Sequence, residues 1–341
     1  MPLQQRVSLE PFNTFGVPAE ARWFLRSDSV EEIVTTLADA ELRRMPRLLL
    51  GGGSNFLFVE DWPGLVIQYE RRGIDLVGED DEHVFIRAAA GEPWHDFVRA
   101  TIGMGHAGLE NLSLIPGTVG AAPIQNIGAY GVELAQRFHS LERVDLDSGE
   151  RVVMSRDDCA FGYRDSWFKH QRPGRFLIAS VTVALPKRPQ WSLGYGDLAR
   201  EVAARGGEVN AALISDVVCD IRRRKLPDPA RIGNAGSFFK NPVVDAATAE
   251  GLRAKFPDLP RYPAPGGFKL PAAWLIEQCG WKGRRRGNAG VSDNHALVLV
   301  NYGSATGAEL WSLAREIIDD VAGTFGVTLE PEPRIPGVNM T

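Results

Sequence analysis

Two glycine-rich segments carry backbone of a kind that binds phosphate groups readily. The first is Gly51-Gly52-Gly53-Ser54-Asn55, which directly follows a short apolar run ending at Leu50. Consecutive glycines let neighbouring N–H groups point into one concavity that suits phosphate oxygens. The second segment runs from Ile115 to Gly131 and is rich in Gly, Ala and Pro, so that its backbone can approach a ligand closely. A structural turn explains either segment alone, but together they favour a ligand that contains a diphosphate.

Three further segments carry side chains suited to acid–base or anion chemistry. Gly162-Tyr163-Arg164-Asp165-Ser166 presents an arginine fork, which suits a substrate carboxylate or, equally well, the neighbouring Asp165. Ser237 stands between a glycine and two phenylalanines, where a hydroxyl activated by its neighbours can donate a proton. Glu330 and Glu332 alternate with prolines that favour extended backbone, so they form either an acidic tail or a buried carboxylate with a raised pKa.

Several other motifs are rejected as sites. Residues 103–108 have the G-x-G-x-x-G spacing but follow a predicted helix instead of a strand, and we interpret Gly103 as a helix C-cap. Ser237 lacks the G-x-S-x-G context of a hydrolase nucleophile. The histidines and cysteines have no metal-ligand spacing, so no metal is predicted. The basic runs at 222–225 and 284–286 are interpreted as solvated surface, the first at a helix end.

Composition narrows the class of protein. The 341 residues, of which 44% are hydrophobic and 24% charged, indicate a globular chain of about two domains. A net charge of −5 excludes a global basic field for nucleic acid, and no apolar run approaches the ~18 residues that span a bilayer. Three widely spaced cysteines exclude a disulfide framework, and the N-terminus has no secretory h-region. We expect a cytoplasmic monomer with neither a nucleic-acid nor a membrane partner.

The elements that position these residues follow an α+β pattern of many short strands. A capping box of Ser29 and Glu32 predicts a helix from there to about Arg44. A second helix is expected at 93–102. Strands are expected at 21–25, 47–50, 65–68, 74–77, 84–89, 138–145, 151–154 and 176–185.

The second half of the chain is richer in helical patterns. Segment 186–210 mixes Pro, Gly and charge, and is interpreted as a boundary with an insertion near 191–207. We therefore expect one domain over 1–190 and a second over 191–341. After the boundary, helices are expected at 211–224, 245–255, 272–279 and 308–325, and strands at 296–301 and 327–330.

Taken in order, these segments resemble the UDP-N-acetylenolpyruvoylglucosamine reductase (UDP-N-acetylmuramate dehydrogenase) family. The ordered set covers the chain from about Leu9 to Ile335 and is highly specific, although each motif alone is weak or moderate. Tyr195-Gly196-Asp197-Leu198 resembles the tyrosine-bearing insertion of the type I branch. The motifs that carry the resemblance are Asn13-Thr14-Phe15-Gly16, residues 51–55, 116–131 and 162–166, Lys225-Leu226-Pro227-Asp228, and residues 233–242 and 330–332.

The resemblance implies a fold, a cofactor and a reaction. The fold is a two-part FAD-binding domain of the p-cresol methylhydroxylase/vanillyl-alcohol oxidase type, followed by a C-terminal α+β substrate-binding domain. FAD is expected to bind non-covalently and NADPH to act as reductant. The expected substrate is UDP-N-acetylglucosamine enolpyruvate, whose enolpyruvyl group is reduced to give UDP-N-acetylmuramate for peptidoglycan precursor synthesis.

The resemblance also assigns roles to individual residues. Arg164 and Glu332 match the pair that stabilises an enediolate, and Ser237 matches the proton donor. The expected substrate-binding residues are Tyr163, Tyr195, Lys225 and Asn241. The expected cofactor-binding residues are Gly51, Gly52, Gly53, Ser54, Asn55, Pro116, Gly117, Gly120, Asn126, Gly128 and Ala129.

Some features depart from the family pattern, and two other functions are weighed. Ala121-Ala122 stands where some relatives have serines, and His295 where some have Gln or Glu; Arg222 is a further candidate for nucleotide binding. A flavin-dependent alcohol oxidase is disfavoured because the small-residue loop holds neither His nor Cys to tether FAD. A non-catalytic UDP-sugar or flavin-binding protein is disfavoured because all three catalytic positions are intact.

Overall fold

The computed structural model describes residues 3–338, which fall into two compact units. Unit 1 comprises residues 1–7, 21–52 and 63–222, and unit 2 comprises residues 8–20, 53–62 and 223–341. Two short N-terminal segments therefore fold with the C-terminal third of the chain. Segment 191–222 folds with unit 1, and the functional division at 190/191 stays a proposal.

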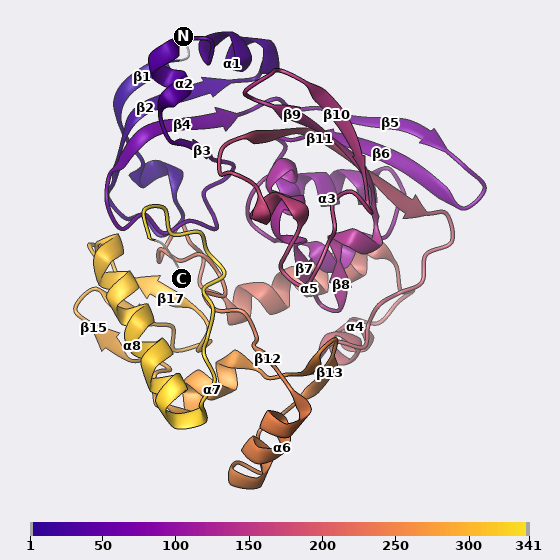
Figure 1. Ribbon diagram of the computed structural model, residues 1–341. Coiled ribbons are helices and arrows are strands. Elements are labelled where there is room, and N and C mark those ends of the chain that lie inside the picture. Colours follow the sequence, from indigo (N-terminus) through magenta and orange to yellow (C-terminus); the bar gives the residue numbers. More distant parts are fainter. Residues whose placement is uncertain (1–2, 339–341) are drawn as a thin grey trace. The chain divides into compact units, whose positions relative to one another are not determined.

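A four-stranded sheet with the order β1-β2-β4-β3 forms one part of unit 1. Of the two short helices beside it (Figure 1), the first packs on it through Val30 and Ile33, which share a buried apolar cluster with Leu37, Leu25 and Leu65. The strand that ends this sheet, β3, leads directly into Gly51. The strands are β1 (Leu3–Ser8), β2 (Glu20–Ser27), β3 (Arg47–Leu49) and β4 (Trp62–Tyr69), and the helices are α1 (Val30–Thr36) and α2 (Ala40–Arg44).

The single helix expected from Ser29 to Arg44 is wrong, because the chain forms two helices there. Ser29 Oγ does accept the N–H of Glu32 at 3.2 Å, as an N-cap should. The Glu32 carboxylate, however, accepts from Ser27 Oγ, so the predicted reciprocal box is incomplete. Asp39 Oδ1 accepts the N–H groups of Glu41 and Leu42 at 2.8 and 3.1 Å. This second N-cap restarts the helix after a break.

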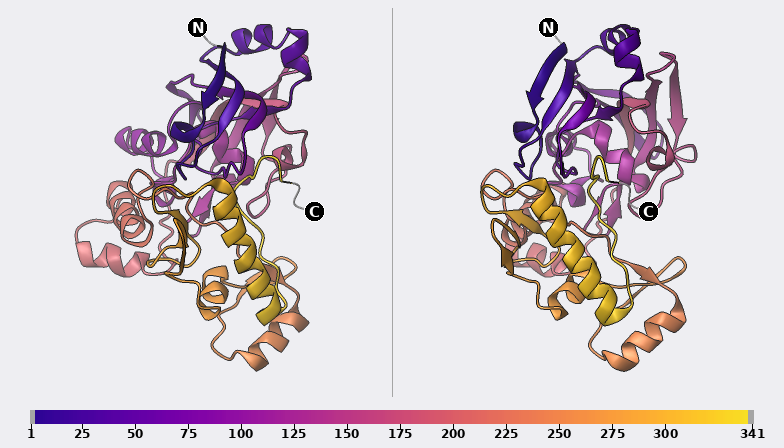
Figure 2. Two further views of the ribbon diagram at one scale, coloured as in Figure 1. Left: turned by 90° about the vertical axis from the view of Figure 1, so that its left-hand side faces the viewer. Right: turned by 60° about the vertical axis from the view of Figure 1, so that its left-hand side comes forward.

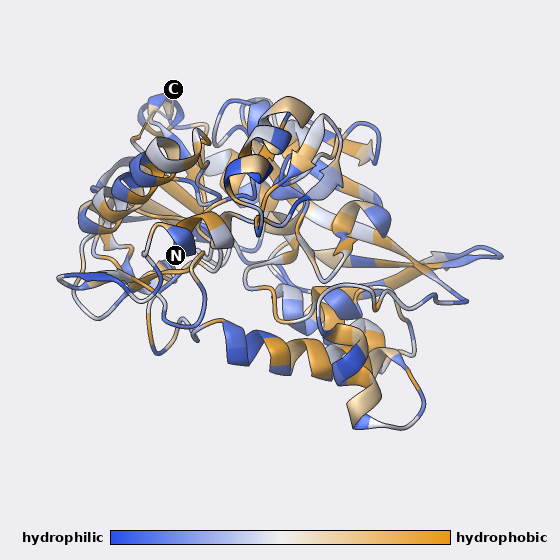
Figure 3. Ribbon diagram, turned by 90° about the horizontal axis from the view of Figure 1, so that it is seen from below, coloured by the Kyte–Doolittle hydropathy of each residue, from blue (hydrophilic) through white to orange (hydrophobic). Residues whose placement is uncertain are grey.

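A five-stranded antiparallel sheet with the order β10-β9-β11-β6-β5 forms the larger part of unit 1. Trp94 and Phe97 of the helix α3 (Trp94–Gly103) are buried against Ile86 and Val181 of this sheet. The charged tip of the β5–β6 hairpin is hydrophilic, as Figure 3 shows. The strands are β5 (Ile74–Glu79), β6 (His83–Ala89), β9 (Phe138–Asp145), β10 (Arg151–Ser155) and β11 (Phe176–Pro186).

The end of α3 corrects one expectation. Gly103 is the last helical residue and Met104 occupies the C-cap with ordinary right-handed backbone. The left-handed position falls on Gly105, whose φ is +88°. The helix before Gly103 confirms that the G-x-G-x-x-G run lies outside a strand–turn–helix context.

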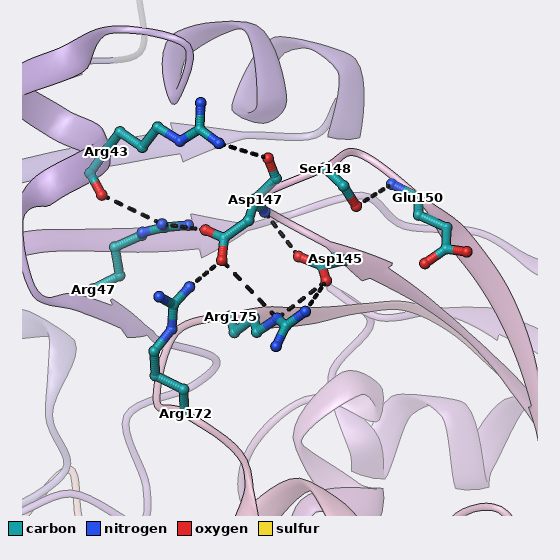
Figure 4. Close-up of polar contacts among 8 residues, drawn as sticks. All are labelled: Arg43, Arg47, Asp145, Asp147, Ser148, Glu150, Arg172 and Arg175. Atoms are coloured by element: carbon teal, nitrogen blue, oxygen red, sulfur yellow. Dashed lines mark hydrogen bonds and ion pairs between the residues drawn. The ribbon is translucent and has the colours of Figure 1, made fainter.

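An arginine–aspartate cluster ties α2 and β3 to the turn after β9 (Figure 4). The buried Arg47 donates to Asp147 Oδ1 at 2.5 Å, and Arg172 also donates to this carboxylate. Arg175 donates from Nη2 to Asp145 Oδ2 at 2.8 Å. Burial alone would raise the pKa of both aspartates, but the hydrogen bonds and charges of the arginines outweigh it and lower both pKa values.

The segment expected as boundary and insertion contains a helix, α4 (Leu198–Arg205), that the sequence pattern did not reveal. Leu198 and Val202 of α4 pack on Ile214 and Val218 of α5 (Ala211–Lys225) in a separate buried cluster. An eight-residue helix buries only two side chains, which is too few to produce a clear period of 3.6.

Unit 2 is built around a long helix, α8, which a complete capping box of Thr306 and Glu309 begins. Phe325 at its end contacts Phe256 at 4.7 Å between ring centroids, and Figure 2 shows this end of α8 beside α6. The helices are α6 (Ala246–Lys255), α7 (Ala272–Gln278) and α8 (Gly307–Phe325). The strands are β12 (Val243–Val244), β13 (Tyr262–Ala264), β14 (Gly267–Lys269), β15 (Arg285–Arg286), β16 (Ala289–Val291) and β17 (Leu299–Asn301).

The strand expected at 327–330 is wrong, because these residues form no strand in the structure. Glu330 accepts the N–H of Lys240 at 2.9 Å, but the next residue, Pro331, has no N–H to continue a ladder. Only isolated bridges form, at Pro331 with Phe239 and at Arg334 with Phe56.

Candidate functional site

The two predicted glycine-rich loops meet in unit 1. A Cβ on Gly52 would lie 3.0 Å from Gly117 Cα, and one on Gly51 would lie 2.7 Å from Thr118 Oγ1. A side chain at Gly52 would therefore push against backbone and separate the loops. The structure brings together segments about sixty residues apart, as the shared diphosphate hypothesis requires.

The second loop is held rigidly by the connection between β6 and α3. Val119 and Gly120 donate their N–H groups to Glu92 O and Ala90 O at 2.8 and 2.9 Å, and Gly117 O accepts from Trp94. Among residues 3–338, the N–H groups of Gly51, Gly52, Gly117 and Thr118 have no backbone carbonyl partner. A bare edge of free N–H groups without side chains fits a pyrophosphate, so these residues fit the expected FAD.

The remainder of the first loop belongs to unit 2. Gly53 has φ +64°, and a Cβ there would lie 1.9 Å from Phe12 O, so only glycine fits. Asn55 accepts the N–H of Arg334 at 2.9 Å and donates from Nδ2 to Glu332 O at 3.3 Å. Ser54 is half-buried between them. This half of the loop is thus joined to the segment that carries Glu332.

The asparagine of the Asn13-Thr14-Phe15-Gly16 motif organises that same region of unit 2. Asn13 is buried, and its Nδ2 donates to Leu9 O and Val17 O at 2.8 and 3.0 Å while its Oδ1 accepts the N–H of Val17. Thr14 then donates its N–H to Gly53 O at 3.2 Å. The motif fixes the position of the glycine loop through its backbone.

Asn126 holds the end of the second loop together. Its Nδ2 donates to Glu133 Oε2 and Gly162 O at 2.9 and 3.0 Å, and its Oδ1 accepts from Ala135 N. Gly128 and Ala129 follow it as the strand β7 (Gly128–Ala129), which pairs with β8 (Val132–Glu133). The Asn126 amide is fully engaged in this scaffold, and the exposed Pro116 marks the other end of the loop.

Arg164 lies beside this hairpin. Its Nη2 donates to Gly128 O at 2.7 Å, and its guanidinium lies 5.6 Å from the ring centroid of Tyr163. Asp165 pairs with His170 at 2.8 Å, so the weighed Arg164–Asp165 pair is not the arrangement found. Arg164 has φ +54°, and Leu114, Asn126 and Tyr130 are also left-handed. Such strain in residues other than glycine gathers at functional sites.

The tyrosine-bearing segment folds onto the same hairpin. Tyr195 lies with its ring centroid 6.0 Å from that of Tyr130, in an edge-to-face arrangement. Asn111 fastens the two segments, because its Nδ2 donates to Tyr130 O at 2.9 Å and to Ser192 O at 2.8 Å. Unit 1 therefore groups Tyr163, Arg164 and Tyr195 around the end of the second loop.

Ser237 and Glu332 lie on paired backbone in unit 2. Phe238, the residue after Ser237, donates its N–H to Leu297 O at 2.7 Å and accepts the N–H of Glu332 at 2.8 Å. Ser237 and Glu332 are both half-buried, while Phe238 is fully buried and anchors the pair. The exposed Glu330 instead pairs with Lys240 at 2.7 Å. The two glutamates of the Glu-Pro-Glu-Pro run thus have different surroundings.

Lys225 and Asn241 are also in unit 2. Asn241 Oδ1 accepts the N–H of Ala272 at 2.9 Å, at the start of α7. His295 Nδ1 accepts from Leu297 N at 3.2 Å. Burial lowers the pKa of His295, and the charges of Lys225 and Lys282 lower it further, so the imidazole is neutral at pH 7. Lys225 therefore acts on a histidine that the sequence reasoning left outside the site.

Within residues 3–338, no group of three His, Cys, Asp or Glu side chains is placed to hold a metal ion. No helix found there is both long and apolar enough to cross a membrane.

Two protein-family models match the chain, one in its first half and one in its second half. A model described as FAD binding domain matches residues 21–155. A model described as UDP-N-acetylenolpyruvoylglucosamine reductase, C-terminal domain, matches residues 228–336. The α+β class predicted from the sequence, with an FAD-binding domain followed by a second α+β domain, is confirmed.

Whole-chain relatives agree. The UDP-N-acetylenolpyruvoylglucosamine reductase of Pseudomonas putida is 51% identical over 97% of this chain and 98% of its own length. That of Burkholderia mallei is 54% identical over 96% of this chain and 95% of its own. The crystal structure of UDP-N-acetylenolpyruvylglucosamine reductase from Thermus caldophilus matches with a TM-score of 0.69 at 26% identity, covering 98% of this chain and 99% of that one.

The matches to whole-chain relatives span nearly the full length of both proteins, and both glycine loops that fit FAD fall within the segment that matches the FAD binding domain model. The chain is an FAD-dependent oxidoreductase, and it belongs to the UDP-N-acetylenolpyruvoylglucosamine reductase family.

Proposed function

We propose that this chain uses NADPH to reduce the enolpyruvyl group of UDP-N-acetylglucosamine enolpyruvate, which yields UDP-N-acetylmuramate for peptidoglycan precursor synthesis. The observation that carries the proposal is the backbone pairing of Phe238 with Glu332. It joins the segment of the expected proton donor to that of the expected carboxylate, as a reductase of this class requires.

We further propose that FAD binds non-covalently along the bare edges of the two glycine loops. The closeness of Gly52 to Gly117 and the free N–H groups beside them support this position. FAD bound there would supply hydride-transfer chemistry through its flavin N5, with NADPH as the reductant and the enol-ether carbon of the substrate as the acceptor. Residues 1–190 then form the FAD-binding domain and residues 191–341 the substrate-binding domain.

Arg164 and Glu332 stabilise the negative charge that the reaction generates on the substrate. Hydride addition to an alkene conjugated with a carboxylate produces an enediolate, with charge spread over two oxygens. The Arg164 fork, turned by left-handed backbone and held by Gly128, supplies positive charge to them. A protonated Glu332 donates a hydrogen bond to the same group.

Ser237 donates the proton that completes the reduction at the α carbon. Its half-buried position beside the buried Phe238 limits water around the hydroxyl. Tyr163 lies beside the carboxylate, and Tyr195, Lys225 and Asn241 hold the sugar nucleotide diphosphate. Binding through the distant UDP keeps the small enolpyruvyl group in reacting geometry.

The test follows the absorbance of the purified holoenzyme under anaerobic conditions. NADPH is expected to bleach the flavin spectrum, and the UDP-enolpyruvyl sugar is expected to restore it. Ser237→Ala is expected to keep the first change and to slow the second by orders of magnitude. Restoration by oxygen alone would favour an alcohol oxidase, and wild-type turnover in Ser237→Ala would remove this serine from the mechanism.

A further inference from the structure

The turn that carries Arg164 holds this residue in strained backbone. Residues 162–165 form a tight turn that two hydrogen bonds close, from Gly162 N to Asp165 O at 3.0 Å and from Asp165 N to Gly162 O at 3.3 Å. Arg164 is the third residue of the turn and has φ +54°. Turns with left-handed backbone at this place ordinarily have glycine there. In a residue with a Cβ, such a conformation persists only where the surrounding structure imposes it.

Lys169 makes a contact with the backbone of Arg164 itself. Its Nζ donates to Arg164 O at 3.0 Å, and a charged donor makes a stronger hydrogen bond than a neutral one. The direction of a carbonyl oxygen depends on ψ of its own residue. The Lys169 ammonium therefore restrains the strained backbone of Arg164, and with it the direction of the bond from Cα to Cβ.

The element that carries Lys169 is firmly anchored in unit 1. Lys169 lies on the short 3₁₀ helix η5 (Trp167–His170). Trp167 donates its N–H to Cys159 O at 2.8 Å, and the next residue, Phe168, is buried. The Trp167 ring lies 5.3 Å from that of Phe168 and 5.0 Å from that of Phe176, measured between centroids. Because the helix is fixed, the Lys169 ammonium reaches Arg164 from a rigid base.

Two other side chains hold the same turn, but at its ends. Asn126 Nδ2 donates to Gly162 O at 3.0 Å, and His170 pairs with the carboxylate of Asp165 at 2.8 Å. Lys169 acts on the residue between these ends. Its loss is therefore expected to leave the turn in place while the backbone of Arg164 relaxes.

We propose that Lys169 is a positioning residue for the reduction, which directs the Arg164 guanidinium toward the substrate carboxylate by holding the Arg164 carbonyl. This inference rests on the proposed function, which assigns that carboxylate to Arg164. Lys169→Met keeps an unbranched side chain but removes the charged donor. Reoxidation of reduced flavin by the UDP-enolpyruvyl sugar is expected to slow about ten- to hundredfold, while NADPH reduces the flavin at the wild-type rate. Lys169→Arg keeps a charged donor and is expected to recover most of the rate.

A binding measurement separates an effect on Arg164 from a general one. Oxidised holoenzyme is titrated with UDP-N-acetylmuramate, which has a carboxylate, and with UDP-N-acetylglucosamine, which has none, and the flavin spectrum is followed. Lys169→Met is expected to weaken binding of the first ligand about tenfold and to leave binding of the second unchanged. Lys187→Met is the matched control, because Lys187 lies in the same unit and pairs with Glu79 at 3.1 Å. It is expected to match the wild type with both ligands.

The decisive measurement combines Lys169→Met with Arg164→Ala. Because Lys169 acts through Arg164, Lys169→Met is expected to change neither the reoxidation rate nor the affinity further once Arg164 is alanine. Equal losses in both backgrounds overturn the inference. So does an effect of Lys169→Met confined to the Tm or the FAD content, which is what a purely structural role predicts.

The same data distinguish failure of this inference from failure of the proposed function. Wild-type protein whose reduced flavin is not reoxidised by the UDP-enolpyruvyl sugar would refute the proposed function. Normal reoxidation in both the wild type and Lys169→Met would refute the role of Lys169 alone.

Discussion

At the residue scale, the site in unit 1 is marked by backbone strain. Leu114, Asn126, Tyr130 and Arg164 all adopt left-handed backbone, which costs roughly 1–2 kcal/mol for each residue with a Cβ. Arg164 reaches Gly128 because of that turn. If stability alone determined these positions, glycine would be expected at each of them, because glycine adopts left-handed backbone without this cost.

Arg164→Lys tests whether the planar fork matters or only its charge. A lysine keeps the positive charge but cannot offer two parallel N–H groups to an enediolate. We expect kcat to fall about 10²- to 10³-fold, while flavin reduction by NADPH proceeds at the wild-type rate. The check is steady-state and half-reaction kinetics on one preparation. Turnover within twofold of wild type would show that charge alone suffices.

Individual residues differ in how well the sequence predicted them. Ser237, Arg164 and Glu332 were reached through motifs and an ordered resemblance, and their roles stay predictions. Arg222 was interpreted with Arg223 and Arg224 as solvated surface, and it was also named as a candidate for nucleotide binding. In the structure its Nε is buried. Three consecutive residues on a helix point about 100° apart, so a pattern of charges does not tell which one is buried. The sequence also gave no indication that the charges of Lys225 and Lys282 act on His295.

At the scale of elements, the proposed FAD-binding surface depends on the contact between the two glycine loops. Each loop was evident from composition, and the burial of β6, the strand before the second loop, follows a period of two. The contact of Gly51 with Thr118 was not evident, because it depends on the sheets that carry the loops. The sequence did not predict the break between α1 and α2, because nothing in it distinguishes Asp39 from an aspartate on the surface of a continuous helix. Only the structure shows that the Asp39 side chain caps α2.

Gly52→Ala tests the contact between the loops. Its added Cβ meets the Gly117 backbone at 3.0 Å, so one loop must move. We expect the Kd for FAD to rise at least about tenfold, which equals 1.4 kcal/mol, measured by fluorescence titration of stripped protein. Gly323→Ala in α8 is the control, because a Cβ there contacts nothing within 4 Å. It is expected to keep FAD affinity and to add about 0.5–1 kcal/mol of stability.

Asp147→Asn tests the arginine cluster that ties β3 to the turn after β9. Removing the charge leaves Arg47 buried and unpaired, which costs on the order of 3 kcal/mol at neutral pH. The folded-state pKa of Asp147 lies below its ordinary value of 3.8. Its contribution is therefore present above pH 3.8 and is lost as the pH falls through the lower, folded-state pKa.

Urea unfolding of wild type and Asp147→Asn between pH 7 and pH 3 checks this. The two free energies of unfolding are expected to differ at pH 7 and to converge in acid. A difference that stays constant over this range would mean that the carboxylate charge is not what stabilises the cluster.

At the scale of the whole molecule, the order of the elements was predictable but their grouping was not. Unit 2 includes residues 8–20 and 53–62, which lie far from the rest of it in sequence. Leu9, Phe15, Leu57 and Phe58 are fully buried. The sequence pattern of these two segments predicts which of their side chains are buried. It does not indicate that the part of the chain that buries them lies more than two hundred residues away.

A fragment of residues 223–341 tests this grouping. It lacks the buried side chains of both N-terminal segments, each of which contributes about 2–3 kcal/mol. We expect the fragment alone to give no near-UV circular dichroism, and added peptides 8–20 and 53–62 to restore part of it. A folded fragment without the peptides would show that unit 2 does not depend on them.

The pairing of the Gly53–Trp62 segment with the end of the chain has a consequence for synthesis. Leu57 donates its N–H to Arg334 O at 2.9 Å, so the ribosome makes the first partner long before the second. At about 5–20 residues per second, Leu57 waits for tens of seconds before its partner exists. During that interval apolar residues of both early segments stay exposed in the nascent chain. Synonymous codons that slow translation of the last third should therefore lower the folded yield while the finished sequence is the same.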